Sequence, residues 1–149
     1  MANQLDKDGN PLAAERPLPD IDRPLSAPFW QAARRHELMI QRCQDCGHWI
    51  WYPQDLCYQC NSAKLGWEKI GGNGTIYTYI VVRHGLHPYF AKHLPLAVAM
   101  VSLDDAPYVR LLANIMECKP EDVKVGMPVE VVFEDVDERV TLPQFRPRR

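Results

Sequence analysis

The chain has 149 residues, a formal net charge of −2 and a hydrophobic fraction of 46%, so it can bury one modest core or two small ones. Near-neutral charge argues against a dedicated nucleic-acid-binding protein, which typically carries a strong basic excess. No apolar run reaches the roughly 20 residues that span a bilayer, and no signal-peptide pattern opens the chain, so we expect a cytoplasmic protein without a membrane segment.

The first 24 residues contain four prolines among charged side chains. This composition buries too little apolar area to fold alone, so we expect the segment to be flexible or to lie over a partner. A short helix is predicted over residues 27–36, because Ser26 stands where an N-cap would and Pro28 suits the first turn. The apolar positions that recur there at helical spacing are Phe29, Ala32 and Ala33. Residues 1–36 are therefore predicted to form a flexible arm and helix.

Two Cys-x2-Cys knuckles, Cys43 with Cys46 and Cys57 with Cys60, are separated by ten residues. Four thiolates at this spacing can converge on one zinc ion. The alternatives are two disulfides or four free thiols, but disulfides need an oxidising compartment that nothing in the chain indicates. Four cysteines fill the coordination sphere, so the zinc would be structural. We expect it to fold residues 37–70, whose own core is too small.

From residue 71 the sequence becomes typical of short β-strands separated by turns. Strands are predicted at residues 75–82, 96–103, 108–115, about 129–133 and about 139–142. Five short strands in this length favour a partly open barrel of the OB type over residues 71–149, with an SH3-like barrel as the alternative. The fold class is therefore mainly β.

An ordered series of motifs makes the sequence resemble a known family. The series is LMIQRCQDCG at 38–47, YP at 52–53, CYQC at 57–60, GNGTIYTY at 72–79, VGMPVEVVF at 125–133 and LPQFRP at 142–147. From about residue 25 to the end, the chain is similar to the zinc-ribbon and OB-fold acyl-CoA-associated proteins, long classed as a domain of unknown function. The resemblance implies an N-terminal helical arm, a rubredoxin-like ribbon and an OB barrel, with the four knuckle cysteines as zinc ligands.

Members of this family are typically partners of thiolase-superfamily enzymes, including aldolases of steroid side-chain degradation, or are fused to hydratases. The resemblance therefore implies a non-catalytic subunit of a hetero-oligomer. It would stabilise an aldolase or an acyl-CoA condensing enzyme and help shape the acyl-CoA site, with no activity alone and no catalytic residue to carry over. The alternative is a module for single-stranded nucleic acid, with bases stacked on Tyr77 or Tyr79. The net negative charge favours the first interpretation.

Two groups of side chains are candidates for partner or ligand contact. Trp30, Trp49, Trp51 and Tyr52 form an aromatic group too large for the ribbon to bury fully. They either pack the ribbon against the barrel or anchor a partner. The second group lies between the first two barrel strands, where OB folds usually bind ligands, and would contact a partner or the phosphates of acyl-CoA, or remain solvated. It comprises Arg83, His84 and His87, with His93 close by.

The remaining chemically suggestive residues have simple alternatives. Cys118 is more typical of a semi-buried free thiol than of a nucleophile. The arginines near the C-terminus could meet phosphates, but such a tail is usually solvated. They are Arg139, Arg146, Arg148 and Arg149.

Overall fold

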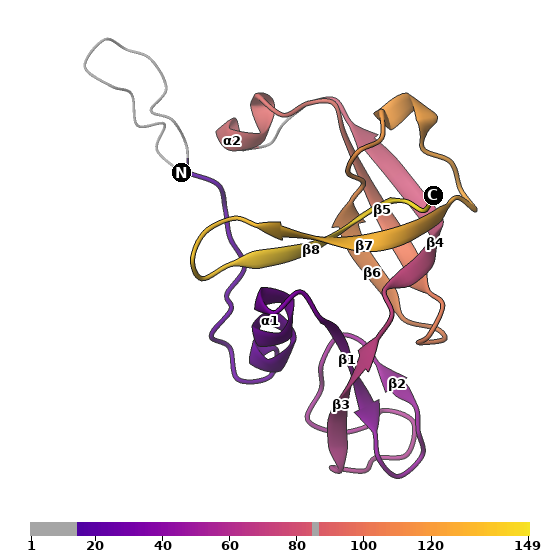
Figure 1. Ribbon diagram of the computed structural model, residues 1–149. Coiled ribbons are helices and arrows are strands. Elements are labelled where there is room, and N and C mark those ends of the chain that lie inside the picture. Colours follow the sequence, from indigo (N-terminus) through magenta and orange to yellow (C-terminus); the bar gives the residue numbers. More distant parts are fainter. Residues whose placement is uncertain (1–14, 85–86) are drawn as a thin grey trace.

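A computed structural model describes residues 15–84 and 87–149 of the chain. It shows a mainly β protein in which a short helix and a small three-stranded ribbon adjoin a five-stranded sheet curled into a near-closed barrel (Figure 1). The N-terminal segment that we expected to be flexible lies partly outside the described residues. Among those residues, no helix has the length and apolar composition needed to cross a membrane.

Residues 15–26, which we call the strap, lead along the barrel into helix α1 (Ala27–Arg34) (Figure 1). Pro28 occupies the first turn, and the predicted apolar face of the helix is buried against β1 and β8. Ser26 takes the N-cap position, although its side chain makes no capping hydrogen bond. The helix ends two residues earlier than predicted, and His36 has a left-handed φ of 58°, which a helix cannot accommodate.

The ribbon consists of β1 (Leu38–Cys43), β2 (Trp49–Ile50) and β3 (Leu65–Ile70) in the order β2-β1-β3, all antiparallel. Strand β3 was not predicted, because its sequence LGWEKI begins with a glycine-containing pair and lacks polar–apolar alternation. It forms because each of its residues pairs with β1.

The barrel contains β4 (Asn73–Val82), β5 (Leu96–Leu103), β6 (Arg110–Asn114), β7 (Pro128–Asp135) and β8 (Thr141–Pro147). Their order is β6-β5-β4-β7-β8, and every neighbouring pair is antiparallel. The short helix α2 (Pro88–Ala91) follows β4, and a 3-10 turn (Pro120–Asp122) follows β6. The end strands β6 and β8 approach each other at one parallel bridge, Ile115 with Phe145, so the sheet almost closes as the OB prediction requires.

The last strand lies further along the chain than we predicted. We expected it near residues 139–142, but β8 continues through Pro143 and Pro147, which cannot donate a ladder hydrogen bond. In the structure, the Phe145 carbonyl accepts from Met116 rather than from β7. Backbone groups alternate in direction along a strand, and Pro143 and Pro147 are each two residues from Phe145, so their nitrogen atoms also face away from β7. Their missing N–H groups therefore remove no hydrogen bond to β7.

The main core extends beyond the barrel. One buried cluster joins Phe29 of α1 and Leu38, Ile40 and Ile70 of the ribbon to the barrel interior, which includes Phe145. A second, small cluster lies at the zinc end of the ribbon and comprises Cys43, Ile50 and Cys57. The base of the ribbon is therefore part of the barrel core, and only its tip has a core of its own.

Candidate functional site

The four knuckle cysteines converge as their spacing predicts. Their Sγ atoms all lie within 4.8 Å of one another. The Sγ–Sγ distance is 3.7 Å both between Cys43 and Cys60 and between Cys46 and Cys57, whereas a disulfide would bring two sulfur atoms to about 2.05 Å. None of these cysteines forms a disulfide, so the disulfide alternative is wrong.

The geometry of this cluster fits a zinc ion. A tetrahedral ion with Zn–S distances of about 2.3 Å holds its sulfur ligands about 3.8 Å apart, close to the separations found here. The backbone N–H groups of Cys46 and Gln59 donate to the sulfur atoms of Cys43 and Cys57. The Cys46 N–H lowers the pKa of the Cys43 thiol to about 6, whereas burial and the neighbouring sulfur atoms raise the pKa of the Cys60 thiol to about 12. The four cysteines would hold a zinc ion that cross-links the ribbon and leaves no position for substrate.

A large apolar cleft of about 1300 Å³ lies between the strap, α1, the ribbon and the barrel. This volume exceeds that of most small-molecule pockets, which span roughly 300–1,000 Å³. The cleft brings together residues that the sequence analysis had singled out separately: Trp30, Trp51, Tyr52, Arg83, His84 and His87. Trp49 does not line it, and instead lies with Arg42 in a smaller hollow beside the knuckle, where the guanidinium carbon is 4.5 Å from the indole centroid.

One wall of the cleft is aromatic and runs from the core to the surface. The buried Phe29 ring lies 4.9 Å from that of Trp51, which stacks on Tyr52 at 5.0 Å. Trp30 meets Phe29 edge-on and is partly buried against the main core, as is Trp51. Tyr52 is 63% exposed. Trp30 and Trp51 thus pack against the shared core of ribbon and barrel, whereas Tyr52 remains accessible to a partner.

The loop side of the cleft carries one arginine and two histidines. Arg83 and His84 form no hydrogen bond or ion pair with another described residue. His87 caps α2, because its Nδ1 accepts from the backbone N–H of Tyr89 at 3.2 Å. The sequence analysis missed this helix, although Pro88 after a possible cap was a usable signal.

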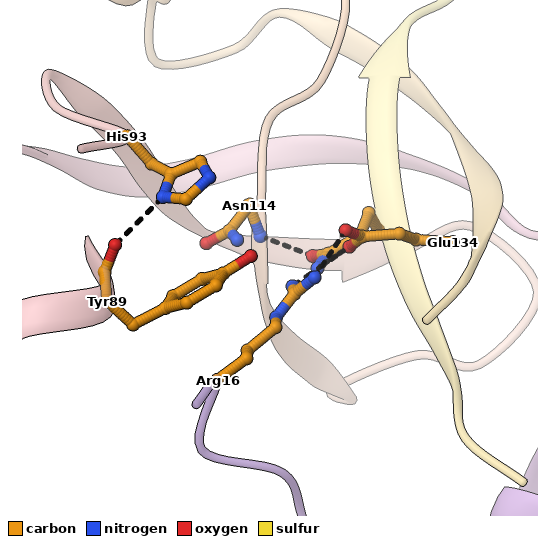
Figure 2. A network of polar contacts seen from close by, with 6 residues as sticks. Arg16, Tyr89, His93, Asn114 and Glu134 are labelled. Carbon is orange, nitrogen blue, oxygen red and sulfur yellow. Dashed lines mark hydrogen bonds and ion pairs between the residues drawn. The ribbon is translucent and has the colours of Figure 1, made fainter. Parts of the chain in front are cut away.

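The strap is fixed to the barrel by a network that no local pattern predicts (Figure 2). Arg16 donates to both carboxylate oxygens of Glu134, at 2.6 and 3.1 Å, and its guanidinium carbon lies 5.7 Å from the Tyr89 ring centroid. The Arg16 contact lowers the pKa of the Glu134 carboxyl. Gln144 donates to the same carboxylate and accepts from the Asn114 N–H. Strap, α2, β6, β7 and β8 therefore meet at one point.

Further contacts hold the strap and α1 against the β7–β8 hairpin. Arg139 pairs with Asp22 at 2.9 Å, and Arg34 donates to the Glu138 carbonyl at 3.0 Å. His36 Nε2 lies 2.9 Å from Asp135 Oδ1, and this contact lowers the pKa of that carboxyl. Together with the Arg16 pair, these contacts fasten the N-terminal part of the described chain to its last hairpin.

Most of the C-terminal arginines form ion pairs within the chain, although their side chains remain partly exposed to solvent. Arg146 lies within β8 and pairs with Glu130 at 3.0 Å and Glu117 at 3.3 Å. Arg148 pairs with Asp104 at 3.5 Å.

The tyrosines considered for base stacking differ in their surroundings. Tyr77 is half-exposed, and the Arg110 guanidinium carbon lies 3.7 Å from its ring centroid. Tyr79 is partly buried against the main core. One face of Tyr77 is therefore already covered.

Family models match two consecutive parts of the chain. Residues 30–66 match the rubredoxin-like zinc ribbon domain of ChsH2, and residues 67–134 match the C-terminal OB-fold domain of ChsH2.

Curated relatives fall into two kinds. A DUF35 domain-containing scaffold protein of Methanocaldococcus jannaschii is 37% identical over 106 residues, which cover 70% of this chain and 72% of the relative. A probable enoyl-CoA hydratase alpha subunit of Thermomonospora curvata is 37% identical over 135 residues, 90% of this chain but 40% of that protein. The chain thus spans about two fifths of the length of this hydratase subunit.

Solved structures show the same arrangement. A chain of the Ltp2-ChsH2(DUF35) aldolase is 35% identical, with a TM-score of 0.78, and the match covers 87% of this chain and 98% of that one. A DUF35-family protein of unknown function from Sulfolobus solfataricus has a TM-score of 0.61 at 14% identity, with 87% and 89% covered, which shows the fold alone.

Proposed function

Because the chain belongs to the DUF35 family and carries the zinc-ribbon and OB-fold domains of ChsH2, we propose that it is a non-catalytic partner subunit of a thiolase-superfamily enzyme. The supporting observation is the 35% identity, over 98% of the matched chain, to a component of an aldolase complex. The scaffold role in the name of the archaeal relative agrees with this proposal. In this role the chain stabilises an aldolase or an acyl-CoA condensing enzyme and acts in the cytoplasm.

The described residues support binding rather than catalysis. The four cysteines that can hold a metal ion would fill its coordination sphere, so the ion would offer no Lewis-acid site. The described residues instead form a large apolar cleft with an aromatic wall. Exposed aromatic side chains at such a surface are typical anchors of protein interfaces.

Within this proposal the cleft faces the partner and the shared acyl-CoA site. Tyr52 contacts the enzyme, supported from behind by Trp51 and Trp30. Arg83, His84 and His87 lie on the loop side of the same cleft, where they meet the phosphates of acyl-CoA or acidic groups of the enzyme.

Co-expression with candidate enzymes tests the proposal. The tagged chain is produced with each thiolase-superfamily enzyme encoded beside its gene, and complexes are identified by size-exclusion chromatography with light scattering. Tyr52→Ala should weaken the complex about 30-fold, the loss of a hot spot of roughly 2 kcal/mol. Tyr58→Ala is the matched control, because Tyr58 is 60% exposed against 63% for Tyr52 but lies outside the cleft.

Other outcomes would contradict parts of the proposal. A stable complex with a hydratase and none with a thiolase-like enzyme would refute the enzyme class while keeping the partner role. Tight binding of a mixed-sequence single strand at physiological salt, without enzyme binding, would instead support the nucleic-acid alternative.

A further inference from the structure

The end strand β6 has an edge that β8 does not cover. In the sheet order β6-β5-β4-β7-β8 the two end strands meet only at the bridge between Ile115 and Phe145 within the described residues. From this bridge back toward Leu112 the two strands diverge without further backbone pairing. On the β8 side, Pro143 has no N–H group with which to pair.

The hydrogen-bond register shows which groups this edge presents. The Ile115 N–H donates to the Ala97 carbonyl, and the Leu103 N–H donates to the Val109 carbonyl. Odd-numbered residues of this hairpin therefore bond to β5, and the even-numbered residues of β6 direct their N–H and C=O groups away from it. Asn114 confirms this parity, because its N–H donates to the Gln144 side chain at 2.7 Å. Arg110 and Leu112 have no such partner among the described residues.

Nothing at this edge discourages pairing with another chain. Natural proteins protect free edges with proline, lysine or inward-pointing charges, but the strand sequence is RLLAN. Leu112 is 61% exposed, and the Arg110 guanidinium is drawn over Tyr77 at 3.7 Å from the ring centroid. A free edge with an exposed apolar side chain is a template for an added strand.

The edge opens into the large cleft, whose charge indicates the kind of occupant. Residues 111–114 and 142–144 both line the cleft. Arg23 and Arg83 also line the cleft, and neither forms an ion pair with a described residue. Arg16 lines it too, but Glu134 already neutralises its charge. The one carboxylate in the described lining is that of Asp20, so the unpaired charge of the lining is positive. An acidic segment therefore fits the cleft better than a basic one.

We propose that β6 accepts an extended acidic segment of the partner enzyme as an added strand of the barrel sheet. The segment pairs with the outward backbone groups of Arg110 and Leu112, and its acidic side chains meet Arg23 and Arg83. This inference rests on the proposed function, since the partner enzyme supplies the segment.

Amide hydrogen exchange tests the pairing directly, with the full chain free and in its complex with the enzyme. The Leu112 amide should exchange at least ten times more slowly in the complex, because it gains an acceptor. The neighbouring Ala113 amide is the internal control, since it bonds to β5 in both states and should remain protected.

Matched substitutions separate backbone pairing from side-chain contact. Leu112→Pro removes an N–H group that has no partner among the described residues, so it should abolish the complex while the zinc content is retained. Leu112→Ala keeps the N–H group and should weaken the complex less than tenfold. For the charge, Arg23→Glu should weaken the complex, whereas Lys124→Glu on an exposed turn outside the cleft should not.

The outcomes distinguish this inference from the function on which it rests. A complex that forms while the Leu112 amide still exchanges freely overturns the added strand and leaves the partner role intact. If no thiolase-superfamily enzyme binds at all, both the added strand and the proposed partner role are refuted. Should Leu112→Pro fail to fold, the exchange measurement on the unmodified chain still decides.

Discussion

Replacement of Ile40 by alanine tests whether the ribbon and the barrel share one core. Ile40 lies on β1, is fully buried and belongs to the cluster that includes the barrel interior. Ile50, on β2, is equally buried but belongs to the small cluster at the zinc end. The same substitution at these two positions should therefore have different consequences, although both isoleucines lie in the ribbon.

The expected loss follows from the atoms removed. Ile→Ala deletes three carbon atoms, worth about 2.4 kcal/mol at about 0.8 kcal/mol per buried methylene. The cavity left in a core that cannot fully collapse raises the loss to about 3 kcal/mol. For a chain of 149 residues, this corresponds to a fall of about 9 °C in the melting temperature of the barrel.

Two signals are followed through one urea series: barrel amide resonances by NMR and zinc release to a chromophoric chelator. Ile40→Ala should move the barrel transition to lower urea. Ile50→Ala should shift zinc release to lower urea concentration and leave the barrel transition nearly unchanged. If Ile40→Ala shifts only zinc release to lower urea concentration, as expected for Ile50→Ala, then the ribbon and the barrel have independent cores and the reasoning is wrong.

Three other predictions concern the metal, the strap and the chemistry. Freshly purified, reduced protein should contain one zinc ion per chain, which Cys57→Ser removes and Cys118→Ser retains in metal analysis. Arg16 depresses the pKa of Glu134, so this carboxylate stabilises the fold above its unfolded pKa of about 4.3, and the contribution is lost as the pH falls through the lower folded value. Glu134→Gln should therefore flatten the decline in melting temperature between about pH 5 and 3, whereas Glu138→Gln, whose carboxylate has no ion pair with a described residue, should not. The isolated chain should not turn over acyl-CoA thioesters, and hydrolysis that persisted through a further purification step would disprove this.

The sequence predicted those parts of the molecule that local patterns determine. The cysteine spacing identified the metal cluster, a β-branched and aromatic run identified β4, and an apolar run identified β5. In each case the decisive residues are neighbours along the chain. Strand β8 was placed too early, and it runs through Pro143 and Pro147. The sequence alone does not show that these two prolines stand at positions that make no hydrogen bond to β7. The Arg16–Glu134 contact joins residues 118 positions apart and has no local signature.

The cleft illustrates the same limit at the candidate site. Trp51, Tyr52, Arg83 and His87 were selected for different reasons from two separate segments. Only the packing of the ribbon against the barrel shows that they line one surface. The open edge at Leu112 depends on the divergence of two strands that are distant in sequence, so no pattern within β6 could have revealed it.

The fastening of the strap and α1 to the β7–β8 hairpin also constrains the order of folding. Its contacts span 99 to 118 positions of sequence, so they cannot form on the ribosome until the second half of the chain has been made. Until then the apolar face of α1, with Phe29, Ala32 and Ala33, lacks its contact with β8. Such a high contact order favours slow folding and exposes the intermediate to aggregation. During synthesis, the apolar face of α1 is therefore exposed until the β7–β8 hairpin has been made.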